Sequence, residues 1–275
     1  MKKTLGLFAL AFGTLAASAP AFAADAKIVL VAGKPSHGPG EHEFNAGILL
    51  LEKCLKQVHG VDPVVVKGGW PADESVFDGA KSIVFFMDGG GGHPVIQSNH
   101  LEVLRKQIDK GVGLVCLHYA VEFPKEHATP ILDWLGGYYE TGYSTNPHND
   151  ITVTPAASHP ISSGVKPFQA NDEWYYKIRF RDNDKRVTPV LTGILPKGSS
   201  NNETLGWAVE RENGGRAFGF TGGHNHTNWG NADFRKLVLN GILWTAKVDI
   251  PAGGVETEVS KEDLAKNLDP KPARK

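Results

Sequence analysis

Short apolar runs alternate with amphipathic segments along the first half of the chain. Each run is rich in valine, isoleucine and leucine and ends at a glycine or a polar residue, which is typical of strands covered on both faces. The strands predicted in this way are residues 27–33, 62–67, 82–87 and 113–117. Apolar residues recur at helical spacing over residues 44–58 and 101–108, and a threonine-proline start predicts a third helix over residues 129–136.

The second half of the chain is richer in strand patterns. The strands predicted there are residues 151–154, 173–180, 187–195, 204–210 and 216–221. A last helix is predicted over residues 233–246, where large apolar residues again recur every three or four positions. Because strands and helices alternate in the first half, the sequence predicts an α/β fold. We expect a mostly parallel central sheet with helices on both faces and extra strands from the second half.

Residues 1–23 have the layout of a secretory signal peptide. Two lysines precede an apolar run over residues 5–17, and the small-x-small triplet at residues 21–23 provides a cleavage site. The run is too short to span a membrane comfortably, so we expect cleavage and a periplasmic or secreted protein; a retained anchor is the alternative. The mature chain would then be one α/β domain over residues 24–250 and a polar tail over residues 251–275.

The charge and the cysteine content of the chain limit the classes of partner and of function that fit it. The chain has 29 basic and 30 acidic residues, and removal of the two signal-peptide lysines leaves a net charge of about −3. Lysine and arginine do not cluster, so nothing favours a nucleic acid or an anionic membrane as partner. Cys54 and Cys116 occupy apolar positions in a predicted helix and strand. Two buried free thiols are the favoured interpretation, and a disulfide is the alternative in an exported protein.

Histidines collect in the loops that follow predicted strands. Seven of the eleven histidines lie in such loops: His37, His42, His93, His118, His148, His224 and His226. Because parallel strands end at one edge of a sheet, we expect these loops to share that edge and to bring the imidazoles together. Clustered imidazoles suit acid–base catalysis near neutral pH or metal binding. No tight metal-binding motif is present, so the cofactor stays unknown, with a divalent metal as one option.

Two further segments carry candidate ligand-binding groups. Asp88 and His93 enclose four glycines, which would either expose backbone N–H groups to a ligand or form a flexible turn. This segment lacks the lysine and hydroxyl residue of a phosphate-binding loop. Residues 171–176 place Glu173 beside three aromatic residues, an arrangement that suits sugar rings; a core strand is the alternative.

Six segments give the chain its resemblance to a known family. They are the SHGPGEHEF loop, GVGLVCLHYA, LDWLGGYYETGY, the stretch from SHPISSGV to NDEWYY, LGWAVERENGGRAF and GGHNHTNW. In their order and spacing they resemble the trehalose-utilisation (ThuA-like) family, a branch of the class I glutamine amidotransferase-like superfamily. The resemblance implies a flavodoxin-like sheet and a role in carbohydrate use, on sugars or oxidised sugars. The positions that match its pocket are His37, His118, Glu173 and His224.

Amidotransferases of this superfamily use a cysteine on a sharp turn after a strand, and Cys116 falls near that place. Such a turn needs glycines two residues on either side, whereas this chain has Leu114 and His118 there. The downstream histidine-x-glutamate pair is also missing. We therefore predict that Cys116 is a strand residue facing the core and that the protein is not a cysteine-dependent amidotransferase.

The resulting hypothesis is an exported enzyme, a hydrolase or a lyase, that acts on a small carbohydrate. His37, His118, His224 and Glu173 are the predicted catalytic residues, with acid–base or metal-binding roles. The predicted substrate contacts are Asp88, Gly90, His93, Tyr119, His226 and Trp229. Two alternatives are kept: a non-catalytic carbohydrate-binding module and a metal-dependent hydrolase or lyase. The sequence does not reveal the oligomeric state.

Overall fold

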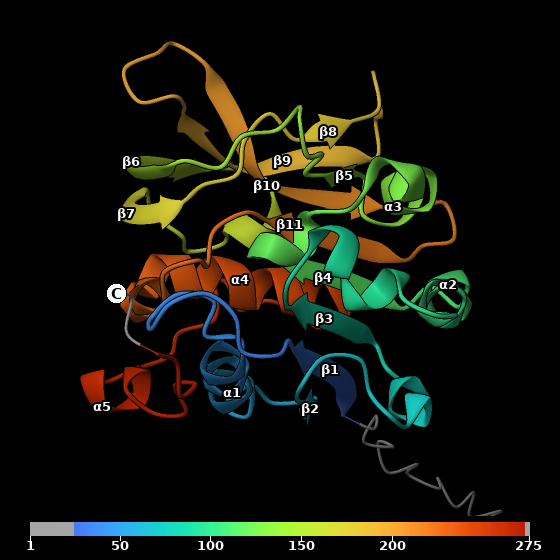
Figure 1. Ribbon diagram of the computed structural model, residues 1–275. Coiled ribbons are helices and arrows are strands. Elements are labelled where there is room, and N and C mark those ends of the chain that lie inside the picture. The colour runs from blue at the N-terminus through green and yellow to red at the C-terminus, as the bar shows by residue number, and fades with distance from the viewer. Residues whose placement is uncertain (1–24, 273–275) are drawn as a thin grey trace, which may run out of the picture.

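One nine-stranded sheet runs through the molecule in the order β2-β1-β3-β4-β11-β10-β9-β6-β7 (Figure 1). The structure is a computed structural model that describes residues 25–272, so the predicted signal peptide lies outside the described residues. The α/β class and the mostly parallel first half of the sheet are as the sequence predicts.

The parallel part of the sheet comes from five strands. They are β1 (Ala26–Ala32), β2 (Val61–Val66), β3 (Ser82–Phe86), β4 (Gly113–Leu117) and β11 (Arg216–Phe220). All neighbouring pairs among them are parallel, including β11 with β4. Their carboxyl ends therefore lie at one edge of the sheet, where an open α/β sheet binds its ligands.

The remaining strands extend the sheet beyond β11. They are β10 (Asn202–Glu210), β9 (Val187–Ile194), β6 (His148–Pro155) and β7 (Phe168–Glu173). Each successive pair from β11 to β7 is antiparallel, so the strand direction alternates. After four reversals, β7 points the same way as the parallel strands, and its last residue, Glu173, reaches the same edge.

The predicted strand over residues 173–180 is wrong in its extent. β7 ends at Glu173, and the chain pairs again only in β8 (Arg179–Phe180), with β5 (Gly137–Tyr138) in a separate two-stranded sheet. Lys177 between them has a φ of 53°, in the left-handed region that a strand cannot contain. The extended backbone is therefore interrupted between β7 and β8.

Helices cover both faces of the sheet. α1 (Phe44–Leu55) and α4 (Ala232–Thr245) pack on the face that presents Leu30 and Phe218. α2 (His100–Asp109) and α3 (Ala128–Trp134) pack on the other face. Side chains of a strand alternate between these two cores, as the pleat requires. The short 3-10 helices are η1 (Glu74–Phe77), η2 (Gly90–Gly92), η3 (Pro94–Ile96), η4 (His118–Val121), η5 (Lys125–His127), η6 (Pro160–Ser162) and η7 (His226–Gly230).

The two cysteines lie on opposite faces of the sheet. Cys54 belongs to the core under α1, and Cys116 belongs to the core under α2. Both are free and buried, and burial raises the pKa of each thiol. Cys116 is therefore a core residue and not an activated nucleophile.

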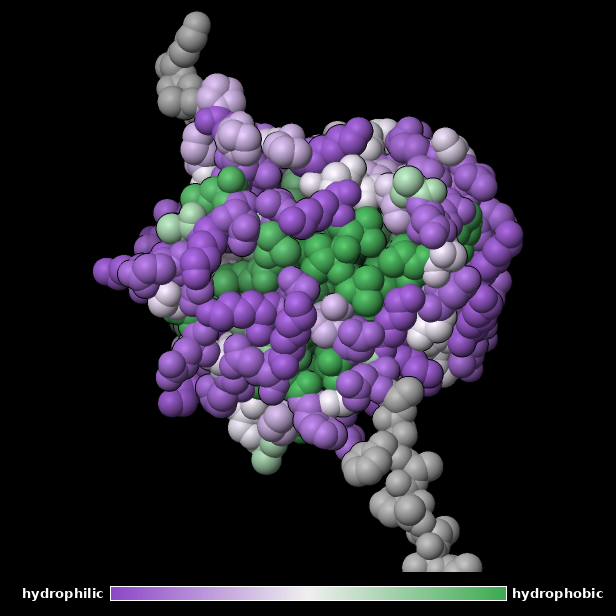
Figure 2. Space-filling model, turned by 90° about the horizontal axis from the view of Figure 1, so that it is seen from below, coloured by the Kyte–Doolittle hydropathy of each residue, from purple (hydrophilic) through white to green (hydrophobic). Residues whose placement is uncertain are grey.

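The tail after α4 is mostly exposed but is held against the domain at several points. Val255 is buried, and α5 (Lys261–Leu264) lies beside α1. Figure 2 shows the molecule from the side of β2 and α1, with an apolar area bordered by polar side chains. β2 is an edge strand there, and Pro63 blocks one of its hydrogen-bonding positions. Within residues 25–272, no helix has the length and apolar character needed to cross a membrane.

Candidate metal centre

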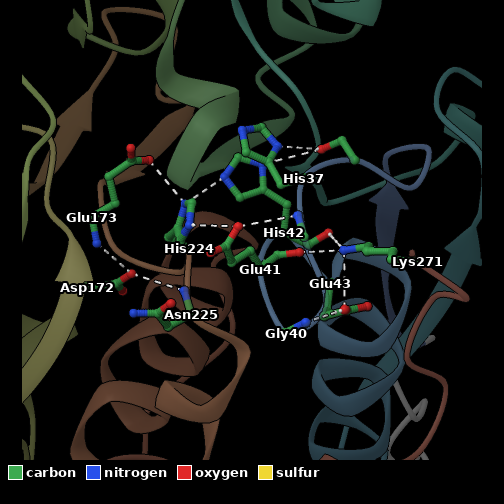
Figure 3. Close-up of polar contacts among 12 residues, drawn as sticks. His37, Gly40, Glu41, His42, Glu43, Asp172, Glu173, His224, Asn225 and Lys271 are labelled. Atoms are coloured by element: carbon green, nitrogen blue, oxygen red, sulfur yellow. Dashed lines mark hydrogen bonds and ion pairs between the residues drawn. The ribbon is translucent and has the colours of Figure 1, made fainter. Parts of the chain in front are cut away.

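Four side chains from four separate segments meet at the carboxyl edge of the sheet. Figure 3 shows three of them, His42, His224 and Glu173. His42 lies in the loop between β1 and α1, and His118 directly follows β4. His224 lies in the loop after β11, and Glu173 is the last residue of β7. The three histidine side chains are almost completely buried, and the Glu173 side chain is 16% exposed. The sheet topology thus assembles one cluster from residues up to 182 positions apart.

The nitrogen atoms of the cluster are close to one another. Nε2 of His42 is 2.9 Å from Nδ1 of His224 and 3.0 Å from Nε2 of His118. Oε2 of Glu173 lies 3.1 Å from Nδ1 of His224 and 3.5 Å from Nε2 of His118. All four donor atoms lie within 4.8 Å of each other.

The hydrogen bonds made by the Nδ1 atoms of His118 and His42 determine which ring nitrogens carry protons. Nδ1 of His118 is 2.9 Å from the carbonyl oxygen of Thr221, which can only accept, so this Nδ1 carries the proton. Nδ1 of His42 is 3.3 Å from Oδ1 of Asp88 and donates to it. In neutral rings both Nε2 atoms are therefore lone pairs, yet they face each other at 3.0 Å. Two lone pairs at that distance repel unless a cation lies between them.

The spacing of the donor atoms fits a divalent metal ion. Metal–ligand bonds of about 2.1 Å place neighbouring donors roughly 3.0 Å apart in an octahedron and roughly 3.4 Å apart in a tetrahedron. Four of the six distances between the donor atoms run from 2.9 to 3.5 Å, and all six lie within 4.8 Å. Histidine ligands whose other nitrogen donates to a carbonyl or a carboxylate are the usual arrangement around protein metals. Three imidazoles and one carboxylate suit zinc, manganese, iron or nickel.

Glu173 is held in place as a carboxylate. Burial alone would raise its pKa, but the neighbouring imidazoles of His118 and His224 outweigh this and lower the pKa well below the ordinary value. Its other oxygen, Oε1, accepts a hydrogen bond of 3.0 Å from Asn146, whose amide oxygen accepts from the Tyr139 hydroxyl. The second oxygen is thus occupied, which leaves Oε2 directed at the imidazoles.

Asp172 fixes the loop that carries His224. Its carboxylate is fully buried and accepts a hydrogen bond of 2.7 Å from the backbone N–H of Gly223. It accepts another of 3.1 Å from the backbone N–H of Asn225 (Figure 3). These contacts join the end of β7 to the loop after β11, although the two strands are far apart in the pairing order. Neighbouring residues of β7 therefore have separate tasks, one holding the loop and one facing the centre.

Three site histidines have backbones in the left-handed region. The φ angles of His37, His42 and His118 are 59°, 45° and 51°. Residues other than glycine rarely adopt this region, at a cost of about 1–3 kcal/mol each, and such residues concentrate at functional sites. The surrounding hydrogen bonds keep them there; the backbone N–H of His42, for example, donates to the carbonyl of His224 at 2.9 Å.

The tail of the chain also supports the loop of His42. The Lys271 ammonium, whose side chain is 3% exposed, lies 3.2 Å from the buried carboxylate of Glu43. It donates to the carbonyl oxygens of Glu41 and of His42, the latter at 3.2 Å (Figure 3). The backbone N–H of Asp269 adds a hydrogen bond of 2.8 Å to Glu43. The loop is therefore held from beneath by a segment about 230 positions away in sequence.

A candidate proton acceptor, His37, lies on the exposed side of the cluster. The ring of His37 lies beside that of His42 with centroids 3.7 Å apart and planes tilted by 32°, and its side chain is 37% exposed. The Ser36 hydroxyl donates to Asp88 at 2.7 Å, so Nδ1 of His37, 3.0 Å from that hydroxyl, donates to Ser36. This leaves Nε2 of His37 as a lone pair. Burial lowers the pKa of His37, so the neutral form prevails near pH 7.

The predicted site residues divide into two groups. His37, Asp88, His118, Glu173 and His224 lie in or beside the cluster, and the Tyr119 ring lies 5.6 Å from that of His42. Gly90 lies next to Tyr119, because a Cβ at this glycine would be 3.5 Å from the tyrosine hydroxyl oxygen.

Three predicted substrate contacts are core residues instead. His93 is fully buried, stacks on Phe123 and donates to the carbonyl of Ala120. The side chain of His226 is buried, and its Nε2 donates to the carbonyl of Leu264. Trp229 is fully buried among aromatic rings. These residues were predicted to contact the substrate because they lie in loops that follow strands. Their side chains instead point inward and form part of the core.

Several residues of the site were not singled out by sequence reasoning. His42 is a central member of the cluster, although only its neighbour His37 was chosen as catalytic. The signal for it was present, since the same loop holds both histidines and the apolar pattern of α1 starts directly after it. Asp172 also stood beside a chosen residue. Asn146 and Lys271 had no sequence signal, because their contacts arise only from tertiary packing.

Solved structures share this fold. A putative ThuA-like protein from Bacteroides uniformis aligns with a TM-score of 0.61 and 17% identity, over 90% of this chain and 99% of that chain. A putative ThuA-like protein from Parabacteroides merdae gives 0.58 and 19%, over 86% and 94%. Agd3, described as a novel carbohydrate deacetylase, gives 0.53 and 14%, over 82% of this chain and 33% of that chain. At these identities the similarity shows the fold alone.

Comparison by sequence gives the family. No curated protein matches the chain. The profile of the ThuA family, described as "Trehalose utilisation", matches residues 28–245 and so spans β1 to the end of α4. The cluster and its supporting loops lie within this match, except for the tail. The chain therefore belongs to the ThuA family.

Proposed function

We propose that this chain is a metal-dependent enzyme of carbohydrate metabolism. A single divalent cation would be held by His42, His118, His224 and Glu173, and His37 would act as the proton acceptor. The observation that carries the proposal is the pair of Nε2 lone pairs of His42 and His118, which face each other at 3.0 Å. The carbohydrate substrate is supported by the family, described as "Trehalose utilisation".

The roles of the residues follow from their contacts. When bound, the cation would act as a Lewis acid toward a substrate oxygen or lower the pKa of a bound water. His37 has its Nδ1 proton fixed by the chain to Ser36 and Asp88, so its free Nε2 can take a proton from a substrate or a water. Tyr119 is close enough to this ring, with centroids 6.1 Å apart, to orient the same group. Hydrolase or lyase chemistry on a sugar fits these parts.

Metal analysis tests the proposal directly. Purified wild-type protein should hold close to one equivalent of a divalent metal by elemental analysis, and His224→Ala should hold almost none. His224 suits this test because its backbone is not in the left-handed region. His159→Ala is the matched control, since His159 is a half-buried histidine beside Trp244, outside the cluster. Equal metal content in all three proteins would rule out the proposed centre.

Activity separates an enzyme from a binding module. Trehalose, its oxidised derivatives and a panel of other sugars are incubated with the protein before and after chelation. Turnover that disappears on chelation and returns with the metal supports the enzyme. Sugar binding that survives chelation, with no turnover of any compound by the metal-loaded protein, would instead support the carbohydrate-binding module.

Export is a separate proposal that rests on residues 1–23. The lysines, the apolar run and the small-x-small triplet support secretion with cleavage after Ala23. The intact mass of the protein from its native host tests this, because the cleaved chain would begin at Ala24. A full-length chain in the cytoplasmic fraction would contradict it.

A further inference from the structure

A cleft of about 340 Å³ opens directly beside the candidate metal centre. It lies over the carboxyl ends of β1, β2 and β3, and Lys34, Trp70 and Asp88 line it. Asp88 belongs to both places, because its Oδ1 accepts from Nδ1 of His42 while the carboxylate also faces the cleft. A molecule in the cleft would therefore contact the residue that holds a metal ligand.

One wall of the cleft is a fixed pair of rings. Trp70 and His100 are stacked with centroids 4.3 Å apart and planes 5° apart. Nε1 of Trp70 donates to Glu74 at 2.8 Å, and the ring of Phe85 lies nearly parallel to the indole with centroids 6.2 Å apart. Because the pair is already ordered, a ligand would pack against this apolar surface without further loss of side-chain freedom. Sugar rings use such surfaces for their C–H faces.

The polar atoms left free in the cleft are mostly acceptors. Nδ1 of His100 donates to the carbonyl of Pro94 at 2.7 Å, so its Nε2 is an acceptor. Nε2 of Gln97 donates to the carbonyl of Gly91 at 3.0 Å, which leaves the Gln97 amide oxygen as an acceptor. The Asp88 carboxylate is a third acceptor, and Lys34 supplies the cation at the exposed rim. Three acceptors in the lining of the cleft suit a ligand with several hydroxyl donors and disfavour an anion.

We propose that this cleft is the sugar subsite of the enzyme. It would hold one neutral pyranose ring whose hydroxyls donate to Asp88, Gln97 and His100, with the reacting part of the substrate directed at the metal centre. The volume of about 340 Å³ is at the low end of the roughly 300–1,000 Å³ typical of small-molecule sites, which fits a single ring and not a polymer. This inference rests on the proposed function, because it gives the metal centre its substrate.

Two adjacent glycines offer a matched test. A Cβ at Gly91 or at Gly92 would meet nothing within 4 Å, and neither residue has a left-handed φ. Both lie in η2, but Gly92 lines the cleft and Gly91 does not. Gly92→Leu should therefore fill the cleft without strain, while Gly91→Leu should place the same side chain outside it.

Glucose is the probe, with gluconate as the charged comparison, and calorimetric titration of the metal-loaded protein is the measurement. We expect Gly92→Leu to weaken glucose binding roughly tenfold or more and Gly91→Leu to leave it within about twofold. Gln97→Leu, at an exposed position, should weaken glucose binding by a smaller factor. This variant removes an acceptor without blocking the cleft. Gluconate should bind more weakly than glucose.

Other outcomes overturn the subsite. The subsite is ruled out if the wild type does not bind glucose, or if Gly92→Leu binds glucose as tightly as the wild type. It is also ruled out if both leucine variants lose the same amount of affinity. Tighter binding of gluconate than of glucose would overturn the assignment of a neutral sugar. Metal content, measured on the same samples, separates this failure from that of the proposed function. Bound metal with unaltered glucose binding in Gly92→Leu removes the subsite alone, whereas missing metal removes the metal centre.

Discussion

The two ends of the sheet make opposite use of charge. At the amino ends of β4 and β11 lies an open groove of about 620 Å³ lined by Arg105, Arg181 and Arg186 together with several acids. These charges compensate one another: Arg181 is 2.6 Å from Asp133, and Arg186 is 2.6 Å from Asp184. At the carboxyl ends the polar atoms are buried, and Nε2 of His42 and Nε2 of His118 face each other at 3.0 Å.

The difference shows that volume alone does not identify a site. The amino-end groove is larger, but the ion pairs of Arg181 and Arg186 need no ligand to be stable. The carboxyl-end cluster is small, and its polar atoms become compatible only when something positive joins them. Buried polar side chains that converge on one point are therefore the better marker of function in this fold. Variants at the two ends test this comparison.

Glu173→Gln should have the largest effect. It keeps the shape of the side chain but removes the negative charge that faces His118 and His224. We expect metal affinity to fall by more than about 100-fold, a larger loss than for residues that only orient a metal ligand. Competition with a chromophoric chelator measures the affinity. Glu122→Gln is the control, because Glu122 is a half-buried carboxylate near the cluster. It accepts a hydrogen bond from the Thr141 hydroxyl. Similar losses in both variants would mean that charge in the region, and not ligation, is what matters.

Lys271→Met should come next. The ammonium holds the carbonyls of Glu41 and His42, so its loss should let the loop of His42 move. We expect metal affinity to fall by about 10- to 100-fold, as for other groups that orient ligands. The measurement is the same chelator competition. Lys266→Met, which removes an exposed pair with Asp263 in the same tail, should leave the affinity unchanged. Unaltered metal binding in Lys271→Met would show that the loop holds its shape without the tail.

His93 tests whether position at the edge is enough to make a site residue. Burial lowers its pKa from 6.5 to about 4, so the unfolded chain takes up the proton first as the pH falls. The stability contributed by neutral His93 is therefore present above pH 6.5 and is lost as the pH falls toward 4. Between pH 7 and pH 5 this amounts to about 2 kcal/mol of unfolding free energy.

Urea unfolding at both pH values measures this effect. His93→Gln should remove about that part of the pH dependence and leave metal content unchanged. The matched control is His159→Gln, because both histidines precede a proline and accept a hydrogen bond from the N–H two residues on. His159 is less buried, so its variant should change the pH dependence less. A loss of bound metal in His93→Gln would place His93 in the site after all.

Arg181→Ala should have the smallest effect. Arg181 and Asp133 are both partly exposed, with 37% and 50% of their side chains accessible. The unfolding free energy should change by less than about 1 kcal/mol, and metal content and turnover should stay the same. A large loss of activity would contradict the comparison, because it would give the amino end a functional role.

Much of the fold follows from local patterns. The strands of the parallel half and the helices between them have apolar spacing strong enough to be located within a few residues, as for β4, predicted and found at residues 113–117. The edge at which His118 and His224 meet follows from parallel strand direction alone. These parts depend on short-range chemistry and one topological rule.

The rest depends on tertiary packing. Glu173 reaches the cluster because β7 points the same way as β11 after four reversals, which no pattern in the sequence encodes. The inward turn of Trp229 and His226 is decided by the core beneath them, and the buried position of Lys271 is decided by a docked tail. Sequence reasoning therefore located the loops of the site but not the direction of each side chain.

The left-handed backbones of His37, His42 and His118 have a practical consequence for mutagenesis. Alanine at these positions changes two things at once, because it removes a ring and also retains a Cβ without the local polar contacts that make such a backbone tolerable. Asparagine adopts this conformation more readily than most residues. Paired alanine and asparagine variants would therefore separate the cost of main-chain geometry from the chemistry of the imidazole.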